Sequence, residues 1–392
     1  MTTRRFVLWT GVAGVALAGA SLSPVLHSDL SKARAPWKAA GTGFDDPRLD
    51  ALSYAVLAPN PHNRQPWLVR LDGEDALTLY CDPARLLRAT DPYDRQIVIG
   101  LGAFLELLRQ AAAEMGFAVE IEAFPEGEPT PLLDGRPVAG VRFVEAAQTP
   151  KDPLFRHISD RRTARGPFDV SKKIAPEEMT ALDGVLGPDD GEFEWVSDAA
   201  NVDGLKTICR EAWRIELETP RTRKESIVLT RIGDDEINAA PDGISLSGPF
   251  IEGLAAAGLL TREKMDAPGA RAYQATLDYY NRAIDTAMGF GWLSTAHNSR
   301  TDQLRAGAGW VRLQLGATAR GLSMQPFSQA LQEYPEMAEI FEEIHDFTGI
   351  RAPETPSAGR VQGLFRFGYS KPAPPSPRWP LETRLIPVEG RA

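Results

Sequence analysis

The spacing of hydrophobic and polar residues changes along the first part of this chain, and each change predicts a helix or a strand. Apolar residues recur at helical spacing over 48–57, and Pro59 and Pro61 end that helix. The segments 67–71 and 77–81 have the patterns of strands, and an Asp- and Gly-rich turn joins them. The pattern therefore predicts a helix followed by a β-hairpin.

A long apolar helix is predicted next, over 97–114, and Gly116 follows it as a C-terminal stop. Strands are predicted over 117–124 and 141–144. The same kinds of element return after residue 150. They comprise a helix that begins near Pro176, a strand over 192–196 and a second long helix over 303–320.

Two internal matches favour a duplication, with halves over 41–150 and 151–392. Each long helix has glycines fourteen residues apart and an arginine seven residues before the first of them: Arg95, Gly102 and Gly116 correspond to Arg300, Gly307 and Gly321. LAPNPHNRQPW (57–67) also matches LGPDDGEFEW (186–195) with one residue deleted and every amide lost. Each match alone is weak, because any helix that ends in glycine can imitate another, but both occur in the same order.

Composition narrows the classes of function. The 392 residues are 43% hydrophobic and 24% charged, as in soluble globular proteins. A net charge of -10 argues against a nucleic-acid partner. Cys81 and Cys209 have no metal-site spacing and the five histidines are scattered, so no metal site is expected. We predict two unpaired core thiols, with a single disulfide as the alternative.

The N-terminus has the pattern of a targeting segment. Arg4 and Arg5 precede an uncharged apolar run from 6 to about 27, which resembles a twin-arginine export signal. The run is also long enough for an uncleaved membrane anchor, and an apolar N-terminal helix of a cytoplasmic protein is the remaining alternative. We therefore expect residues 1–40 to lie outside the fold, and the protein to be periplasmic or membrane-anchored.

Two polar clusters carry the candidate chemistry. APNPHNRQPW (58–67) places three side-chain amides and a histidine between the first helix and the first strand. HISDRRTARGPF (157–168) places three arginines beside a threonine, a density of donors that suits a phosphate or another oxyanion. On charge alone, a solvated turn paired with Asp160 and Asp169 is the better explanation of the second cluster.

These clusters and two further motifs resemble those of the nitroreductase-like flavoproteins. RRTARGPF is similar to the family's Arg-Arg-Ser-x-Arg segment, and APNPHNRQPW to its Ala-Pro-Ser-Ser-x-Asn-x-Gln-Pro-Trp segment. ATARGLSMQPF resembles the alanine-rich helix that ends in Gly-Leu-Gly-Ser/Thr, and FGYSKPAPPSPRWPLETRL the C-terminal proline-rich run. The duplicated arrangement looks most like the Acg-type members, in which two half-domains of one chain imitate the usual homodimer. About 197–295 aligns with nothing in the family.

The resemblance implies an α+β fold of the FMN-dependent nitroreductase type, with two half-domains forming a pseudo-dimer within one monomeric chain. Each half would be a mainly antiparallel sheet flanked by helices, and the two long helices would pack at the pseudo-dimer interface. Part of the unaligned middle, about 215–270, would be a lid over the site, built as a long loop with short helices. The proline-rich tail would form a C-terminal arm.

The resemblance also implies one FMN site per chain. Its candidate residues are Arg161, Arg162, Thr163 and Arg165 for the phosphate and ribityl chain, Pro59, Asn60 and Asn63 against the flavin, Ser323 and Met324 near its N5, and Arg378 as a further phosphate ligand. Asn60 and Pro61 replace the family's two serines. We expect His62 to bind a backbone carbonyl; the alternative is that it donates to the flavin or the substrate.

The function that the resemblance implies is an FMN-dependent oxidoreductase. It would pass hydride from NAD(P)H to a small-molecule acceptor such as a nitroaromatic or a quinone. No catalytic side chain is assigned, because the flavin carries the chemistry. The alternative hypothesis is a flavin-sequestering protein whose site is covered by a lid. A third hypothesis is a structural relative of the family that binds no flavin. Membrane contact is expected only through the N-terminal segment.

Overall fold

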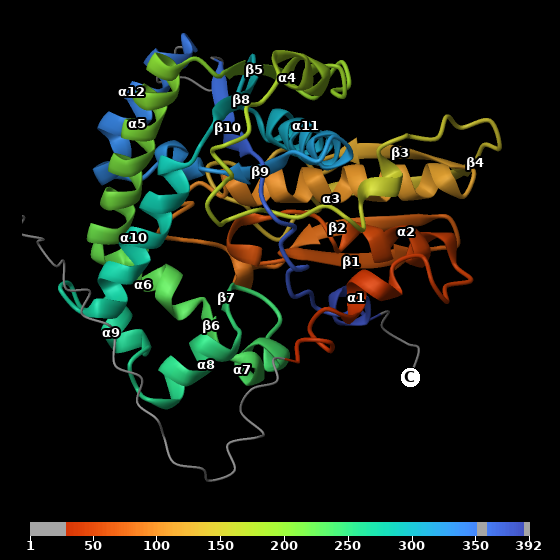
Figure 1. Ribbon diagram of the computed structural model, residues 1–392. Helices are drawn as coiled ribbons and strands as arrows, with labels where there is room; N and C mark the ends of the chain where they lie inside the picture. The colour runs from red at the N-terminus through yellow and green to blue at the C-terminus, as the bar shows by residue number, and fades with distance from the viewer. Residues whose placement is uncertain (1–28, 351–358, 388–392) are drawn as a thin grey trace, which may run out of the picture.

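The computed structural model describes residues 29–350 and 359–387 (Figure 1). The twin-arginine-like segment falls outside these residues. The described chain nevertheless begins within the part that we expected to lie outside the fold. Leu30, Ala33 and Trp37 are buried, and Trp37 lies on helix α1 (Ala35–Ala39) and donates its indole N–H to the Ser376 carbonyl at 2.7 Å. Residues 29–40 are therefore part of the folded protein.

The first sheet is antiparallel and confirms the pattern predicted for the first half. Its strands, in the order β1-β2-β4-β3, are β1 (Trp67–Asp72), β2 (Ala76–Cys81), β4 (Ala139–Glu145) and β3 (Phe117–Ala123). The expected hairpin pairs Trp67 with Cys81 and Asp72 with Ala76. Helix α2 (Pro47–Ala55) precedes the sheet and begins at an Asp46 cap, because that side chain accepts the Arg48 N–H.

The second sheet is also antiparallel, and its order is β5-β8-β10-β9. The strands are β5 (Glu192–Val196), β8 (Gly289–Thr295), β10 (Arg360–Gly368) and β9 (Ser323–Pro326), and the helices in this part include α4 (Pro176–Asp183) and α12 (Ala338–Thr348). Sequence patterns did not predict β8 or β10. Nearly all their residues are buried, so neither strand shows the alternation that marks a half-exposed one.

The two predicted long helices are α3 (Arg95–Glu114) and α11 (Arg300–Ala319), and they lie against each other (Figure 1). They cross at the glycines that the internal matches had aligned. A Cβ atom on Gly102 would lie 1.9 Å from the Leu304 carbonyl oxygen, and one on Gly307 would lie 2.0 Å from that of Ile99. Only glycine permits so close a contact. Helix α3 is long and apolar enough to span a bilayer, but 89% of that stretch is buried inside the protein.

The segment between β5 and β8 contains the expected short helices, but short connections join them in place of one long loop, and a longer helix stands on each side of them. Its elements are α5 (Ala199–Glu218), α6 (Pro220–Val228), β6 (Thr230–Ile232), α7 (Asp234–Ala239), β7 (Ile244–Leu246), α8 (Pro249–Ala256), α9 (Arg262–Asp266) and α10 (Arg271–Asp285). Helix α5 was missed although Val202, Leu205 and Cys209 form its buried face. Cys81 and Cys209 are both free and buried, which confirms the prediction of two unpaired core thiols.

Candidate functional site

The loop that joins α2 to β1 has a strained backbone that its own amide side chains stabilise. His62, Asn63 and Gln65 have φ values of 46°, 51° and 52°, in the left-handed region that non-glycine residues seldom adopt. The Asn60 side chain accepts the Gln65 N–H at 2.7 Å and donates to the Ala58 carbonyl at 3.1 Å. The Gln65 side chain donates to the Pro241 carbonyl at 2.8 Å. The Asn63 side chain donates to the Pro377 carbonyl at 3.0 Å, so all three amides bind backbone groups.

Two buried arginines meet at the carbonyl groups at the start of this loop. Arg161 donates to the Leu57 carbonyl and to the Gln314 side-chain oxygen, both at 2.8 Å. Arg378 donates to the Leu57 and Ala58 carbonyls at 3.1 Å each, and to the Asn63 side-chain oxygen. Both arginines are 2% exposed. The structure thus joins the two polar clusters through neutral oxygens.

These two guanidinium groups retain unused donors. The Nε atoms of Arg161 and Arg378 are buried and have no hydrogen-bond acceptor among the described residues. Within the same residues, no ion pair joins either side chain to a carboxylate. Buried arginines are ordinarily paired, so this arrangement requires explanation. An anion bound between them would supply the missing acceptors.

We call Arg161, Arg162, Arg165 and Arg378 the arginine cluster. The Trp37 ring lies against three of these arginines. The centres of the Arg162, Arg378 and Arg161 guanidinium groups lie 4.6, 5.6 and 5.7 Å from the Trp37 ring centroid. Cation–π contact partly offsets the burial of charge. Trp37 was not predicted, because it lies within the first 40 residues, which we expected to lie outside the fold, and no pattern connects it to the arginines.

The electrostatics of the cluster favour an added negative charge. Burial, together with the charges of the neighbouring Arg162 and Arg165, lowers the pKa of Arg161 to about 9. Burial and the charges of Arg161, Arg165 and Arg162 hold the pKa of Arg378 well below its ordinary value. A guanidinium remains protonated in proteins, so these shifts report unfavourable free energy that a bound anion would relieve.

The other candidate residues lie near the arginine cluster, and each makes contacts of its own. The Thr163 hydroxyl accepts from the Gln314 amide at 3.1 Å, and the Met324 carbonyl accepts the Ala164 N–H at 3.4 Å. Strand β9 therefore lies beside the arginine segment. The Ser323 hydroxyl bonds to that of Ser370 at 2.8 Å, and the Met324 side chain is buried in the core. Pro59 and Asn60 are half-buried and Arg165 is exposed.

Helix α6 and the segment after α7 cover the α2–β1 loop. His62 Nε2 lies 3.2 Å from the Ser226 hydroxyl of α6, so its partner there is a side chain rather than the expected backbone carbonyl. The Gly243 N–H donates to the Asn63 carbonyl at 3.3 Å. Asp242 accepts from Arg85 at 2.8 Å and from Arg231 at 2.6 Å. Sequence analysis missed Ser226 and Asp242, because nothing in their spacing relates them to the loop.

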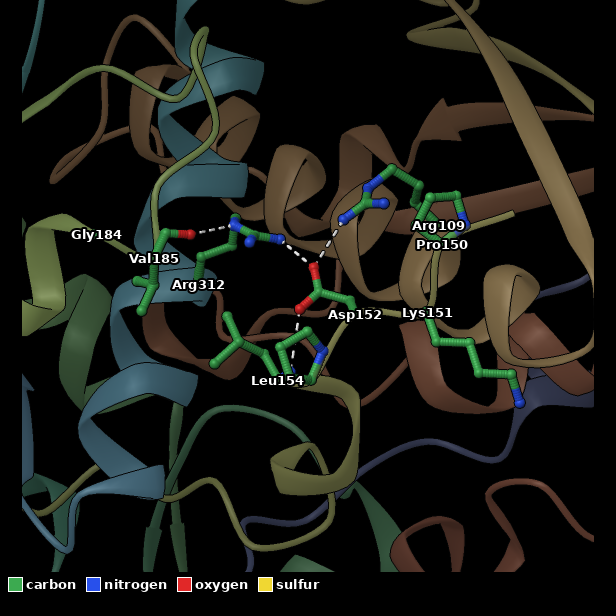
Figure 2. Close-up of a pocket in the computed structure, with 9 residues that line it drawn as sticks. Arg109, Pro150, Lys151, Asp152, Leu154, Gly184, Val185 and Arg312 are labelled. Atoms are coloured by element: carbon green, nitrogen blue, oxygen red, sulfur yellow. Dashed lines mark hydrogen bonds and ion pairs between the residues drawn. The ribbon is translucent and has the colours of Figure 1, made fainter. Parts of the chain in front are cut away.

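Two surface cavities lie away from the arginine cluster. One, of about 330 Å³, is lined by Arg109, Asp152 and Arg312 among others (Figure 2). Its two arginines are paired with carboxylates, because Asp152 lies 3.2 Å from Arg109 and 2.5 Å from Arg312, and Glu106 lies 2.7 Å from each. The other, of about 500 Å³, lies between residues 86–89 and α6. Neither cavity includes an arginine of the cluster in its lining.

Sequence comparison relates most of the chain to nitroreductase-like proteins, although no family model matches it. It is 26% identical over 345 residues to "Putative NAD(P)H nitroreductase Rv3131" of Mycobacterium tuberculosis, over 84% of this chain and 91% of that protein. It is 36% identical over 121 residues to "Putative NAD(P)H nitroreductase acg" of the same species. That match covers 30% of this chain and only 34% of the relative's length.

Solved structures give a weaker likeness. The FMN-dependent nitroreductase NfnB of Mycobacterium smegmatis, in complex with NADPH, is 18% identical, with a TM-score of 0.33 over 55% of this chain and 87% of that one. A nitroreductase of Bacteroides fragilis with bound FMN is 13% identical, with a TM-score of 0.32 over 56% and 90%. The sequence relatives support the resemblance to the nitroreductase-like family, whereas TM-scores this low add nothing to it.

Proposed function

We propose that this chain is a nitroreductase-like flavoprotein, an FMN-dependent oxidoreductase that passes hydride from NAD(P)H to a small acceptor such as a nitroaromatic or a quinone. One observation carries the proposal. Arg161 and Arg378 are buried against neutral oxygens, and each has a free Nε donor. A phosphate monoester supplies the negative charge and the acceptor oxygens that this arrangement lacks. The names of the sequence relatives support the same class of reaction.

The residues present fit FMN. The arginine cluster would bind the phosphate, and Thr163 would lie beside the ribityl chain. Pro59, Asn60 and Asn63 would line the flavin from the α2–β1 loop, with Ser323 and Met324 across from them. The bound flavin would supply the hydride chemistry, while this chain would bind and orient the acceptor and exclude water. Neutral amides and backbone groups suit that task, because their charge does not change with pH.

We further propose that the site lies between two duplicated half-domains, over 41–150 and 151–392, which pair within a monomer. The two sheet orders correspond strand for strand, β1-β2-β4-β3 to β5-β8-β10-β9. The proposed lid, about 215–270, lies in the segment inserted between β5 and β8. The first residue of α3 and the first residue of α11 each donate a hydrogen bond to the other proposed half-domain. Arg95 donates to Glu333 at 2.8 Å, and Arg300 donates to the Pro131 carbonyl at 2.7 Å.

Export is a separate proposal that rests on the N-terminal sequence alone. Arg4, Arg5 and the apolar run that follows would direct the folded, cofactor-loaded protein to the periplasm or anchor it in the membrane. Fractionation of cells that express the full chain tests this. An Arg4→Lys, Arg5→Lys variant should remain in the cytoplasm, and its appearance in the periplasm would exclude this route.

The purified full chain tests the flavin assignment directly. We expect the visible spectrum of oxidised flavin, near-stoichiometric release of FMN on denaturation, and bleaching by NADPH under anaerobic conditions that an added quinone reverses. Flavin that NADPH does not bleach would point to the sequestering alternative. Colourless protein that does not take up added FMN would refute the proposal.

Charge removal localises the phosphate site. Arg162→Gln should lower FMN affinity because it removes one of the cluster's charges. Arg156→Gln is the matched control, because Arg156 is an exposed arginine on the same segment and is not in the cluster. Equal FMN affinity of the two variants, measured by fluorescence titration, would remove Arg162 from the site.

A further inference from the structure

Arg366 is a buried arginine on β10 whose guanidinium group binds three other segments of the chain. It is 0% exposed. Its Nε donates to the Gln325 side-chain oxygen on β9 at 2.8 Å. Its Nη1 donates to the Ala283 carbonyl near the end of α10, and its Nη2 to the Gly166 carbonyl, both at 2.5 Å. One side chain therefore joins β9, α10 and the segment that carries the arginine cluster.

Every donor of this guanidinium group has a neutral acceptor. Nη1 also lies 3.3 Å from the Thr286 hydroxyl, and Nη2 lies 3.4 Å from the Ala164 carbonyl oxygen, so its five N–H groups all face oxygens. The Nε of Arg366 is occupied, whereas the Nε atoms of Arg161 and Arg378 are free. Arg366 therefore has no donor left for an anion, and it stabilises the backbone that it contacts.

The Phe168 ring fixes the plane of the Arg366 guanidinium group. The guanidinium centre lies 3.7 Å from the ring centroid, a close cation–π contact. The Phe168 N–H donates at 2.9 Å to the Thr286 hydroxyl, which Arg366 also contacts. A Cβ atom on Gly368 would overlap the ring, so the ring packs tightly on β10. The end of the segment 157–168 is therefore held against β10 and the end of α10.

We propose that Arg366 is a positioning residue for the phosphate end of the candidate flavin site. It binds the carbonyl groups of Ala164 and Gly166, which flank Arg165 in the chain. These contacts fix the backbone from which the Arg165 side chain, a candidate phosphate ligand, extends. The identity of the ligand rests on the proposed function, whereas the contacts that hold the segment do not depend on it.

Gln314 of α11 holds the other end of the same segment. Its amide donates to the Thr163 hydroxyl at 3.1 Å and to the Arg162 carbonyl at 3.2 Å, and its oxygen accepts from Arg161 at 2.8 Å. The segment is thus fixed from both sides, by one neutral side chain and by Arg366. Donors that are already in position bind a phosphate more tightly, because ordering them on binding costs free energy.

A second copy of this segment occurs at the start of the described chain. DLSKARAPW (29–37) aligns with DRRTARGPF (160–168) without a gap; four positions are identical, and the last is aromatic in both. The first copy has Leu30 and Ser31 where the second has the first two arginines of the cluster. The first copy therefore lacks two phosphate ligands but keeps the alanine and the aromatic residue that Arg366 contacts in the second.

An arginine binds the same two positions in the first copy. The Arg378 backbone N–H donates to the Ala33 carbonyl at 2.8 Å, and the Arg378 guanidinium centre lies 5.6 Å from the Trp37 ring centroid. These positions align with the alanine and the aromatic ring that Arg366 contacts. The alanine carbonyl and the ring are therefore the points at which an arginine holds the segment in both copies.

Binding of FMN and of riboflavin to the purified full chain tests the positioning role, because riboflavin lacks the phosphate. Arg366→Lys keeps the charge but cannot reach all the oxygens that the guanidinium group binds. Its FMN affinity should fall about 10-fold, as when one charge-assisted hydrogen bond to the phosphate is misaligned. Its riboflavin affinity should not change. Equal losses for the two flavins would show a general structural role and overturn the proposal, as would an unchanged FMN affinity.

Arg360→Lys is the matched control. Arg360 begins the same strand, and its guanidinium centre lies 5.2 Å from the Phe341 ring centroid, so its contacts differ from those of Arg366. Both flavin affinities should stay as in the native chain. If Arg366→Lys does not fold, Thr286→Val decides in its place, because it removes the hydroxyl that accepts the Phe168 N–H. It should weaken FMN binding about 3-fold and leave riboflavin binding unchanged.

Amide hydrogen exchange tests the same contacts without a ligand. The Ala164 and Phe168 amides, which donate to β9 and to the end of α10, should exchange about 10-fold faster in Arg366→Lys. The Ile386 amide, which donates to β1, should exchange as in the native chain. A uniform change, or none, would overturn the positioning role. A native chain that binds neither flavin would refute the proposed function instead, and the exchange result would then decide whether Arg366 holds the segment.

Discussion

Arg161 and Arg378 donate to the same carbonyl oxygen, that of Leu57, at 2.8 and 3.1 Å. Arg161 stands before the second sheet in the chain and Arg378 after it, so a single peptide group of the α2–β1 loop fixes both. Two buried positive charges that share one neutral acceptor repel each other at short range. The contact supports the proposal that the arginine cluster binds an anion, and it suggests which substitutions are informative.

Arg378→Gln should weaken FMN binding. It removes a charge-assisted donor that is worth about 2 kcal/mol, which corresponds to a loss of affinity of roughly 30-fold. The matched control is Arg384→Gln, a buried arginine on the same C-terminal arm that lies over Trp379 and outside the cluster. Isothermal titration with FMN measures both. Comparable losses in the two variants would attribute the effect to the arm as a whole.

Gly102→Ala and Gly307→Ala should each destabilise the protein by about 3 kcal/mol, because the added methyl group would overlap a backbone carbonyl of the opposite helix. Chemical denaturation measures the change. Gly253→Ala in α8 is the control, since a Cβ atom there meets nothing within 4 Å. That variant should gain up to about 1 kcal/mol from helix propensity. Tolerance of both core substitutions would mean that α3 and α11 do not cross at these glycines.

Glu216→Gln should alter the pH dependence of stability. The pKa of Glu216 rises from 4.5 to about 7 on folding, so the folded state binds the proton more tightly than the unfolded state. Stability from this group is therefore complete below pH 4.5 and is lost as the pH rises toward 7, by about 3 kcal/mol. The variant cannot titrate there, so its unfolding free energy relative to the native chain should rise over the same range. A constant difference would contradict the raised pKa.

Asp242→Asn should loosen the segment that covers the α2–β1 loop. Asp242 is 5% exposed and pairs with Arg85 and Arg231; loss of its charge leaves Arg85 with Asp82 but removes the carboxylate partner of the half-buried Arg231, at a cost of about 3 kcal/mol. Hydrogen exchange at the Gly243 amide, which donates to the Asn63 carbonyl, should report the opening. Asp266→Asn breaks the half-exposed pair with Arg223 and should change this exchange by less than about 1 kcal/mol.

The sequence by itself determined the local elements of the first half and the helices that frame the site. The spacing of hydrophobic residues and the positions of glycine and proline located β1, β2, α3 and β5 within a few residues. These elements are either amphipathic or bounded by glycine and proline. The repeated glycine spacing also identified Gly102 and Gly307 as equivalent positions before their contact was visible. The motif resemblance selected Arg161, Asn63 and Arg378, which the fold then brings together.

Only the tertiary structure decided what those residues contact. Strands β8 and β10 show no alternation of hydrophobic and polar residues, because nearly all their residues are buried. Helix α5 is stabilised by packing that no local sequence pattern predicts. Trp37, Ser226 and Asp242 reach the site from segments that no sequence pattern connects with it. A free donor on Arg378 or a raised pKa at Glu216 depends on burial and on distant neighbours, and those are set by the folded chain.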